Sequence, residues 1–221
     1  MRQWSVSIAL VVLSLVPTIG GIARLNSLAQ PITEQNARFV AAPLPVVLHV
    51  IAAVIFSVLG AFQFAAAFRR RSPRWHRLAG RVVAVSGLVA GVSGVWMTAM
   101  YAIPTPTQGP LLLATRLVVG SAMSLFIVLA VRAILQRDVA SHEAWMTRAY
   151  ALGQGAGTQV LLLGVPALFL GGDILGVTRD VLMLASWVSN AVFAEWLIRR
   201  RQARTSSVAA VSTGSFARRA S

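Results

Sequence analysis

The chain has 221 residues, of which 57% are hydrophobic and only 12% are charged, and its mean hydropathy is +0.72. Soluble domains carry about twice this share of charged residues, so the composition is typical of an integral membrane protein. The chain has no cysteine, which excludes disulfides, iron–sulfur clusters and thiolate-bound metals. The net charge of +14 comes from arginine alone, because the sequence contains no lysine.

Six stretches are long and apolar enough to cross the hydrocarbon core, which takes about 20 residues of helix. We predict an all-α fold with one transmembrane domain over residues 1–201, followed by a disordered basic tail over residues 202–221. The spans are predicted near residues 4–23, 44–68, 78–101, 111–132, 149–170 and 180–198. An alternative interpretation of the first span is a cleaved signal peptide. Its uncharged stretch is longer than the usual ~7–15 residues, which favours a retained helix.

Sixteen of the twenty arginines fall at the termini or in every second gap between these stretches. This positive-inside pattern predicts a multi-pass protein of the cell membrane with both termini in the cytoplasm. The arginines form no single basic face with aromatic side chains, so we expect them to contact anionic lipids of the inner leaflet and no nucleic acid. The four arginines outside this pattern are Arg24, Arg38, Arg116 and Arg179.

Two histidines begin helices at the predicted cytoplasmic face in similar surroundings. Ser72-Pro73 is typical of an N-cap followed by proline at the first helical position, which places His76 in the first turn of the third span. Ser141 is expected to cap the helix of the fifth span, with His142 in its first turn. The tryptophans and arginines next to both histidines are ordinary interfacial anchors.

Polar side chains inside the spans are costly in lipid and usually face the interior of the bundle. Those of this chain are His49, Gln63, Arg116, Gln154, Gln159, Asn190 and Glu195. The glycine-rich run 153–159 is explained equally by tight helix packing and by a polar cavity, and we predict that its helix is central in the bundle. Glu195 is expected to pair with an arginine, either Arg199 four residues further on or one from another helix.

Several segments resemble the bacterial membrane-protein family catalogued as domain of unknown function 2306. They are Leu48-His49, GAFQF at residues 60–64, RWHRLAGR at residues 74–81 and HEAWMTRAY at residues 142–150, while residues 155–159 and 190–196 are similar to one branch of the family. The resemblance covers residues 39–201 and implies the same multi-pass topology, but no particular activity. Many members have an arginine near position 159 or 160, where this chain has Gln159-Val160, so a role of that arginine in anion binding is not carried over.

Three functions remain open. The first is a membrane electron-transfer protein with haem b, in which His76 and His142 are the axial ligands and Arg81 and Arg148 pair with the propionates. The second is a carrier of a small solute, proton or lipid, whose path is lined by the intramembrane amides and Glu195. The third is a structural or accessory membrane protein whose polar groups only fix the packing of helices.

Enzymatic motifs are not found in this sequence. It has no P-loop, no G-x-S-x-G, no H-E-x-x-H and no acidic cluster for Mg²⁺, so nothing in it indicates a hydrolase or a nucleotide-dependent enzyme. Zinc bound by His76, His142 and Glu143 is a further alternative that rests on three donors alone.

Overall fold

The computed structural model is all-helical and describes the backbone of residues 4–217 and the side chains of residues 4–65 and 67–204. Within this part, six segments are long and apolar enough to cross a membrane: Ser5–Ala29, Pro43–Gln63, Pro73–Met100, Pro110–Leu135, Val139–Leu170 and Gly176–Arg204. The prediction of an all-α bundle with six spans is therefore confirmed.

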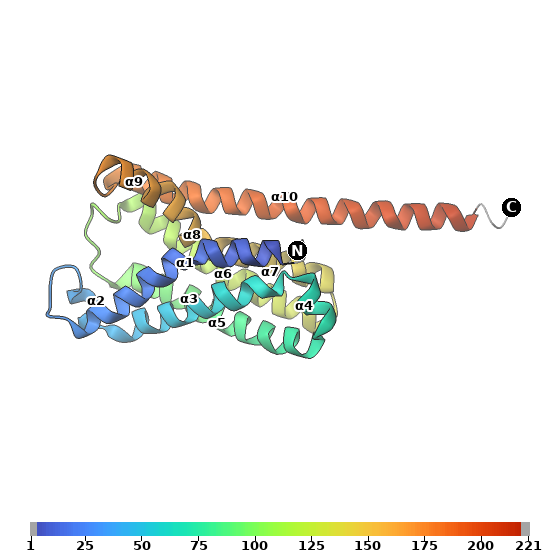
Figure 1. Ribbon diagram of the computed structural model, residues 1–221, viewed down its shortest axis with the longest axis horizontal. Coiled ribbons are helices and arrows are strands. Elements are labelled where there is room, and N and C mark those ends of the chain that lie inside the picture. Colours follow the sequence, from blue (N-terminus) through green and yellow to red (C-terminus); the bar gives the residue numbers. More distant parts are fainter. Residues whose placement is uncertain (1–3, 218–221) are drawn as a thin grey trace.

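The longer helices are α1 (Ser5–Asn26), α3 (Pro43–Gln63), α5 (Pro73–Met100), α6 (Pro110–Leu135), α7 (Val139–Gly153) and α10 (Gly176–Ala217). The short elements are a 3₁₀ helix (Ser27–Ala29), α2 (Ala37–Ala41), α4 (Ala66–Arg71), α8 (Gly155–Gln159), a π-helical segment (Val160–Gly164) and α9 (Val165–Leu170). Figure 1 shows α2 and α9 at one end of the bundle and α4 at the other, with the start of α1 and the end of α10 toward α4. We call these the α2 end and the arginine-rich end, the latter after Arg69, Arg70 and Arg71 of α4.

The helices differ from the predicted spans mainly at their ends. Hydropathy locates apolar residues and therefore misses the polar first and last turns, through which the backbone stays helical. Thus α5 begins at Pro73 and α7 at Val139, both before the apolar stretches that define their predicted spans. The second span is shorter than predicted, because α3 ends at Gln63 and the backbone of Ala65 is extended before α4.

The two predicted helix caps have different outcomes. Ser72 is the N-cap of α5 with Pro73 at the first position, as predicted. The cap predicted at Ser141 is wrong, because the Asp138 carboxylate caps α7 by accepting a hydrogen bond from the Ser141 N–H at 2.9 Å. Hydrogen bonds from Ser141 hold the pKa of the Asp138 carboxyl below its usual value.

Helix α10 continues beyond the sixth predicted span. It reaches Ala217, whereas the sequence predicts a disordered tail from residue 202, and Figure 1 shows it running past the rest of the bundle. Residues 201–204 are arginine, glutamine and alanine, which are good helix formers, so the backbone need not leave the helix where the apolar stretch ends. The remainder of the predicted tail, residues 218–221, lies outside the described residues.

Small residues of α5 allow it to pack closely against α3 and α6. Gly87 faces Phe56 of α3 and Ile127 of α6, where a Cβ atom would lie 2.6 Å from either side chain. Two turns further along α5, Gly94 faces His49 of α3. The buried core lies between these helices and α7, and it comprises Phe56, Ala61, Val83, Met123, Ile127, Ala149, Tyr150 and Leu152. The predicted role of the small residues in helix packing accounts for their spacing.

We expect the arginine-rich end to face the cytoplasm, because arginine clusters are retained on that side. The native chain lacks cysteine, so single cysteines can report each end. Glu34 is exposed before α2, and Arg137 is exposed in the turn between α6 and α7. In intact cells, a membrane-impermeant maleimide should label Glu34→Cys and should label Arg137→Cys only after permeabilisation. Labelling of both from the outside would contradict this orientation.

Candidate functional site

A cavity of about 590 Å³ lies within the bundle, and residues of all six spans line it. Its charged side chains are Arg24, Arg38, Arg116 and Arg179, and its larger polar side chains include His49, Gln154 and Gln159. These include every arginine that falls outside the positive-inside pattern of the sequence. The volume lies within the range of small-molecule sites, about 300–1,000 Å³.

Four different elements bring the arginines to one depth near the α2 end. Arg24 is in the last turn of α1, Arg38 is in α2, Arg116 follows the start of α6 by six residues, and Arg179 follows the start of α10 by three. At 1.5 Å per residue, Arg116 is about 9 Å from the beginning of its helix and Arg179 about 5 Å. The four guanidinium groups therefore belong to the α2 half of the cavity.

None of these arginines forms an ion pair with a carboxylate of the described residues. Arg116 Nη1 donates to Gln108 Oε1 at 2.5 Å, and Arg179 Nε donates to the Thr107 carbonyl at 3.1 Å. Both acceptors are neutral and belong to the loop before α6. The positive charges are therefore oriented by hydrogen bonds but not neutralised by them.

Arg24 and Arg38 lie against the same aromatic ring. Their guanidinium carbons are 4.6 and 4.5 Å from the centroid of the Phe39 ring. Burial first, and then the positive charge of Arg24, lower the pKa of Arg38. A cation–π contact stabilises each guanidinium by roughly 0.5–2 kcal/mol without cancelling its charge.

Asp180 is the nearby acidic side chain, and it is only 2% exposed. Its Oδ1 accepts from the Gly109 N–H at 3.2 Å and its Oδ2 from the Leu112 N–H at 3.1 Å, so it caps α6 from α10. The negative charge of Asp180 attracts Arg116, whereas the positive charge of Arg179 repels Arg116. One carboxylate held by backbone donors leaves the four arginines with a net positive charge.

His49 was predicted as an interior polar residue, and it lines the cavity. Its Nδ1 lies 3.0 Å from the Ala90 carbonyl and 3.2 Å from Ser93 Oγ. Because a carbonyl only accepts hydrogen bonds, Nδ1 carries the proton toward Ala90. His49 is thus held against α5 on the wall of the cavity.

Gln154 connects three helices below the arginines. Its Nε2 donates to Tyr150 Oη at 2.8 Å and lies 3.2 Å from Ser14 Oγ of α1, and Tyr150 Oη donates to the Ser57 carbonyl of α3 at 2.6 Å. A Cβ atom on Gly157 would come within 2.6 Å of the Leu13 backbone oxygen, so α8 also touches α1. The prediction that the glycine-rich helix is central is confirmed.

Gln159 differs from Gln154, because its Nε2 is buried without a hydrogen-bond partner among the described residues. It ends α8, and a π-helical segment follows directly. Such segments inside α-helical spans are frequent at functional sites. The Gln159 amide is therefore a donor, on the cavity wall, that packing alone does not satisfy.

Asn190 joins the fifth and sixth spans and lies outside this cavity wall. Thr158 Oγ1 donates to Asn190 Oδ1 at 2.9 Å, and Asn190 Nδ2 donates to the Ala151 carbonyl at 3.0 Å. Gln63, at the end of α3, has a buried Nε2 with no partner among the described residues. Neither of these two amides lines the cavity that contains Arg24, Arg38, Arg116 and Arg179.

His76 and His142, predicted as a cofactor site, lie at the arginine-rich end and not on the cavity wall. The His76 imidazole interacts electrostatically with His142, Arg69 and Glu143, and Arg69 pairs with Glu143 at 2.8 Å. His142 Nδ1 lies 2.9 Å from the Ala130 carbonyl, whereas His76 Nδ1 is buried with no partner in the part that the structure describes.

The two arginines predicted to assist that site are placed differently. Arg81 is exposed on α5. Arg148 is half-buried and is engaged by Glu195 of α10. No group of three or more histidine, aspartate and glutamate side chains is close enough to hold a metal ion within the described residues.

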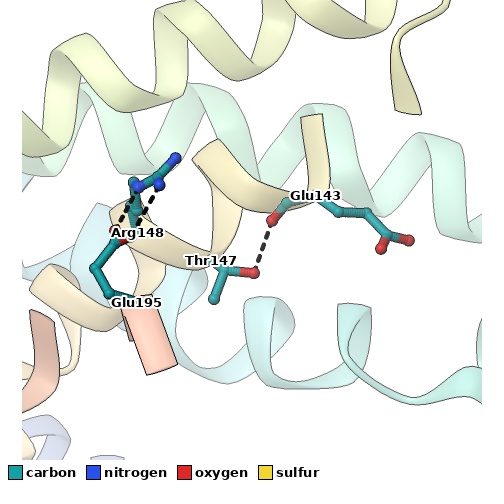
Figure 2. A network of polar contacts seen from close by, with 4 residues as sticks. All are labelled: Glu143, Thr147, Arg148 and Glu195. Atoms are coloured by element: carbon teal, nitrogen blue, oxygen red, sulfur yellow. Dashed lines mark hydrogen bonds and ion pairs between the residues drawn. The ribbon is translucent and has the colours of Figure 1, made fainter. Parts of the chain in front are cut away.

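Glu195 pairs across the bundle and not with Arg199. Figure 2 shows its two carboxylate oxygens facing the Arg148 guanidinium, and the distances are 2.5 Å from Nε to Oε1 and 3.0 Å from Nη2 to Oε2. The expectation that an arginine holds this carboxylate is confirmed. The bidentate contact fixes α7 against α10 at the arginine-rich end.

We expect Glu195→Gln to destabilise the protein by about 1 kcal/mol, because both partners are partly solvated and such pairs contribute little more. The measurement is thermal unfolding in detergent. Arg199→Gln, which changes an exposed residue one turn further on, is the control and should have no measurable effect. Equal losses in both variants would mean that the local arginine carries the interaction.

Sequence reasoning identified Arg116 but missed Arg24, Arg38 and Arg179 as site residues. The available signal was that these four alone fall outside the positive-inside pattern. Arg24 and Arg179 are near the ends of spans and Arg38 is between two spans, where an arginine is usually explained by the membrane interface. Only the packing of the helices shows that they share one cavity.

Comparison with known proteins gives a family. No curated protein and no solved structure matches the chain. Residues 46–198 match the family described as predicted membrane protein, DUF2306, and this match extends from α3 into α10. Since the match covers more than half of the sequence, the chain belongs to the DUF2306 family of predicted membrane proteins.

Proposed function

We propose that the protein is a carrier in the cell membrane that binds a small anionic solute in the arginine-lined cavity. The observation that carries this proposal is the gathering of Arg24, Arg38, Arg116 and Arg179 on one cavity wall, without an ion pair to any described carboxylate. The four side chains are partly buried, and burying a charge that lacks a partner is costly, so they suit a site that an anion completes. Arginine also matches the planar geometry of carboxylate and phosphate groups.

Two further features support an anion over a cation or a neutral solute. The unpartnered Gln159 Nε2 is a hydrogen-bond donor, and it lines the same cavity. The Asp180 carboxylate, whose charge attracts Arg116, is already engaged by two backbone N–H groups. The cavity therefore presents donors and positive charge to a ligand, which an anion complements.

The position of the cavity supports a carrier. Its charged residues are near the α2 end, while Ser14, Ser57, Tyr150 and Gln154 form a hydrogen-bonded layer further toward the arginine-rich end. A carrier that works by alternating access requires a binding site inside the bundle that several spans share, and residues of all six spans line this cavity.

The proposal is tested by titrating the purified chain in phosphatidylcholine nanodiscs at constant ionic strength. Sodium octanoate and sodium phosphate are the anionic probes, and octylammonium chloride is the control of opposite charge. Trp187 lines the cavity, so its fluorescence is read as the difference between the native chain and Trp187→Phe. A saturable response to an anion, absent with octylammonium, supports the proposal. An equal response to octylammonium, or no response to either anion, overturns it.

A haem-binding electron-transfer protein is the second candidate, and one observation favours it. The Nδ1 of His142 donates to the Ala130 carbonyl and leaves Nε2 free to bind a metal, which is the usual arrangement of metal-binding histidines. Against it, both histidines are in the first turns of their helices, which is shallow for a haem. An absorption spectrum of the purified protein tests it: a Soret band that His142→Ala abolishes would establish haem binding.

A further inference from the structure

The cavity changes in character along its length. On α3, His49 follows the first residue by six positions, Ala53 by ten and Phe56 by thirteen, which correspond to depths of about 9, 15 and 20 Å. On α6, Arg116 and Met123 are about 9 and 20 Å from the start of the helix. All of these residues line the cavity. Charged side chains therefore lie in the part of the cavity nearer the α2 end, and apolar side chains lie about 10 Å further toward the arginine-rich end.

The polar groups at the deeper level are already satisfied by one another. Gln154 is bonded to Tyr150 and Ser14, and the Tyr150 hydroxyl is bonded to the Ser57 carbonyl. The remaining surface there comes from apolar or aromatic side chains such as Phe56, Met123, Leu152 and Trp187. This part of the cavity offers little to a second charge and favours a hydrocarbon group.

The volume leads to the same conclusion. A cavity of about 590 Å³ is much larger than a single inorganic anion and has the size of sites for drug-sized molecules. An inorganic anion at the arginines would leave the apolar half of the cavity, near Phe56 and Met123, unfilled. A ligand with both a charged and an apolar part fills both halves.

We propose that the ligand is an amphipathic anion, with a carboxylate or phosphate head at the arginine layer and an apolar chain extending toward Phe56 and Met123. This inference rests on the proposed anion site and adds the class of its ligand. Burial of each further methylene should strengthen binding by about three- to four-fold until the chain reaches the end of the cavity near Phe56 and Met123.

The test compares acetate, butanoate, hexanoate, octanoate and inorganic phosphate under the titration conditions given above, with empty nanodiscs subtracted. Affinity should rise at each step of the carboxylate series, and octanoate should bind at least ten-fold more tightly than acetate or phosphate. The variant Ala53→Leu, which fills part of the apolar half of the cavity, should weaken the binding of octanoate at least five-fold and leave the binding of acetate unchanged. Ala99→Leu, at an exposed position of α5, is the matched control and should change neither.

The possible failures are distinguishable. The inference is overturned if acetate or phosphate binds as tightly as octanoate, or if Ala53→Leu leaves the affinity for octanoate unchanged. Either result would mean that the apolar chain does not occupy the region near Phe56 and Met123, while the anion site itself would stand. The carboxylate series decides the same point without a variant, should Ala53→Leu fail to fold. If no anion binds, or if Arg116→Gln weakens none of them, the anion site itself is overturned.

Discussion

The substitution Arg116→Gln should lower the affinity of the cavity for an anion by about 10- to 100-fold, which corresponds to the loss of one charge-assisted hydrogen bond, about 1.5–3 kcal/mol. Arg116 is chosen because it is the arginine placed deepest along its helix, six residues after Pro110. The measurement is the fluorescence titration of Trp187 with octanoate.

The same variant should be as stable as the native chain, or more stable, when no anion is present. Arg116 is half-buried, and its hydrogen bond goes to the neutral Gln108 amide, so its charge is not offset by an ion pair among the described residues. Removing it relieves the free energy of desolvation, whereas removing a paired arginine would leave a carboxylate exposed to apolar surroundings. Lower affinity together with unchanged or higher thermal stability is the result expected of a ligand-binding arginine.

The matched control is Arg132→Gln, in the last turn of the same helix at the arginine-rich end. It removes the same charge from α6 and should leave the titration unchanged, because Arg132 is exposed and does not line the cavity. If Arg132→Gln weakens octanoate as much as Arg116→Gln does, the anion is attracted by the overall charge of the protein. That outcome would contradict a site at Arg116.

The sequence predicted the architecture well, because the properties that define it are local. The length of each apolar stretch and the side on which arginines gather depend only on residues close together in the chain. Helix ends that were placed by hydropathy alone were less accurate, because α7 begins at Val139 in a polar segment that hydropathy ignores, whereas Ser72-Pro73 correctly indicated the start of α5. Depth along a helix was likewise readable, because His49 and Arg116 each fall near the start of a predicted span.

The site could not be predicted because it depends on the direction in which each helix faces. Four spans lie between Arg24 and Arg179 in the sequence, and nothing in the sequence shows that these two side chains turn toward one cavity. The same ambiguity applied to Glu195, for which Arg199 on its own helix and Arg148 on another were both suitable partners. Rotation about the helix axis is determined by contacts between small residues, and these contacts are known only from the packed structure.

Gly157→Ala should destabilise the protein by up to about 2 kcal/mol, although alanine is the better helix former. A Cβ atom at this position would lie 2.6 Å from the backbone oxygen of Leu13 and 2.6 Å from its Cγ. Overpacking of this kind costs about 1–3 kcal/mol, and the helix propensity of alanine offsets about 1 kcal/mol of it. The measurement is thermal unfolding in detergent, with urea titration as the second measurement.

The control is Gly20→Ala in α1, which is the helix that Gly157 touches. Nothing lies within 4 Å of a Cβ atom at Gly20, so this variant should be neutral or stabilising, and the two substitutions should differ in sign. Combining Gly157→Ala with Leu13→Ala should not restore stability, because truncation removes the Leu13 side chain but leaves its backbone oxygen in place. Recovery in the double variant would mean that only a flexible side chain opposes the methyl group, and the close backbone approach of α8 to α1 would then be contradicted.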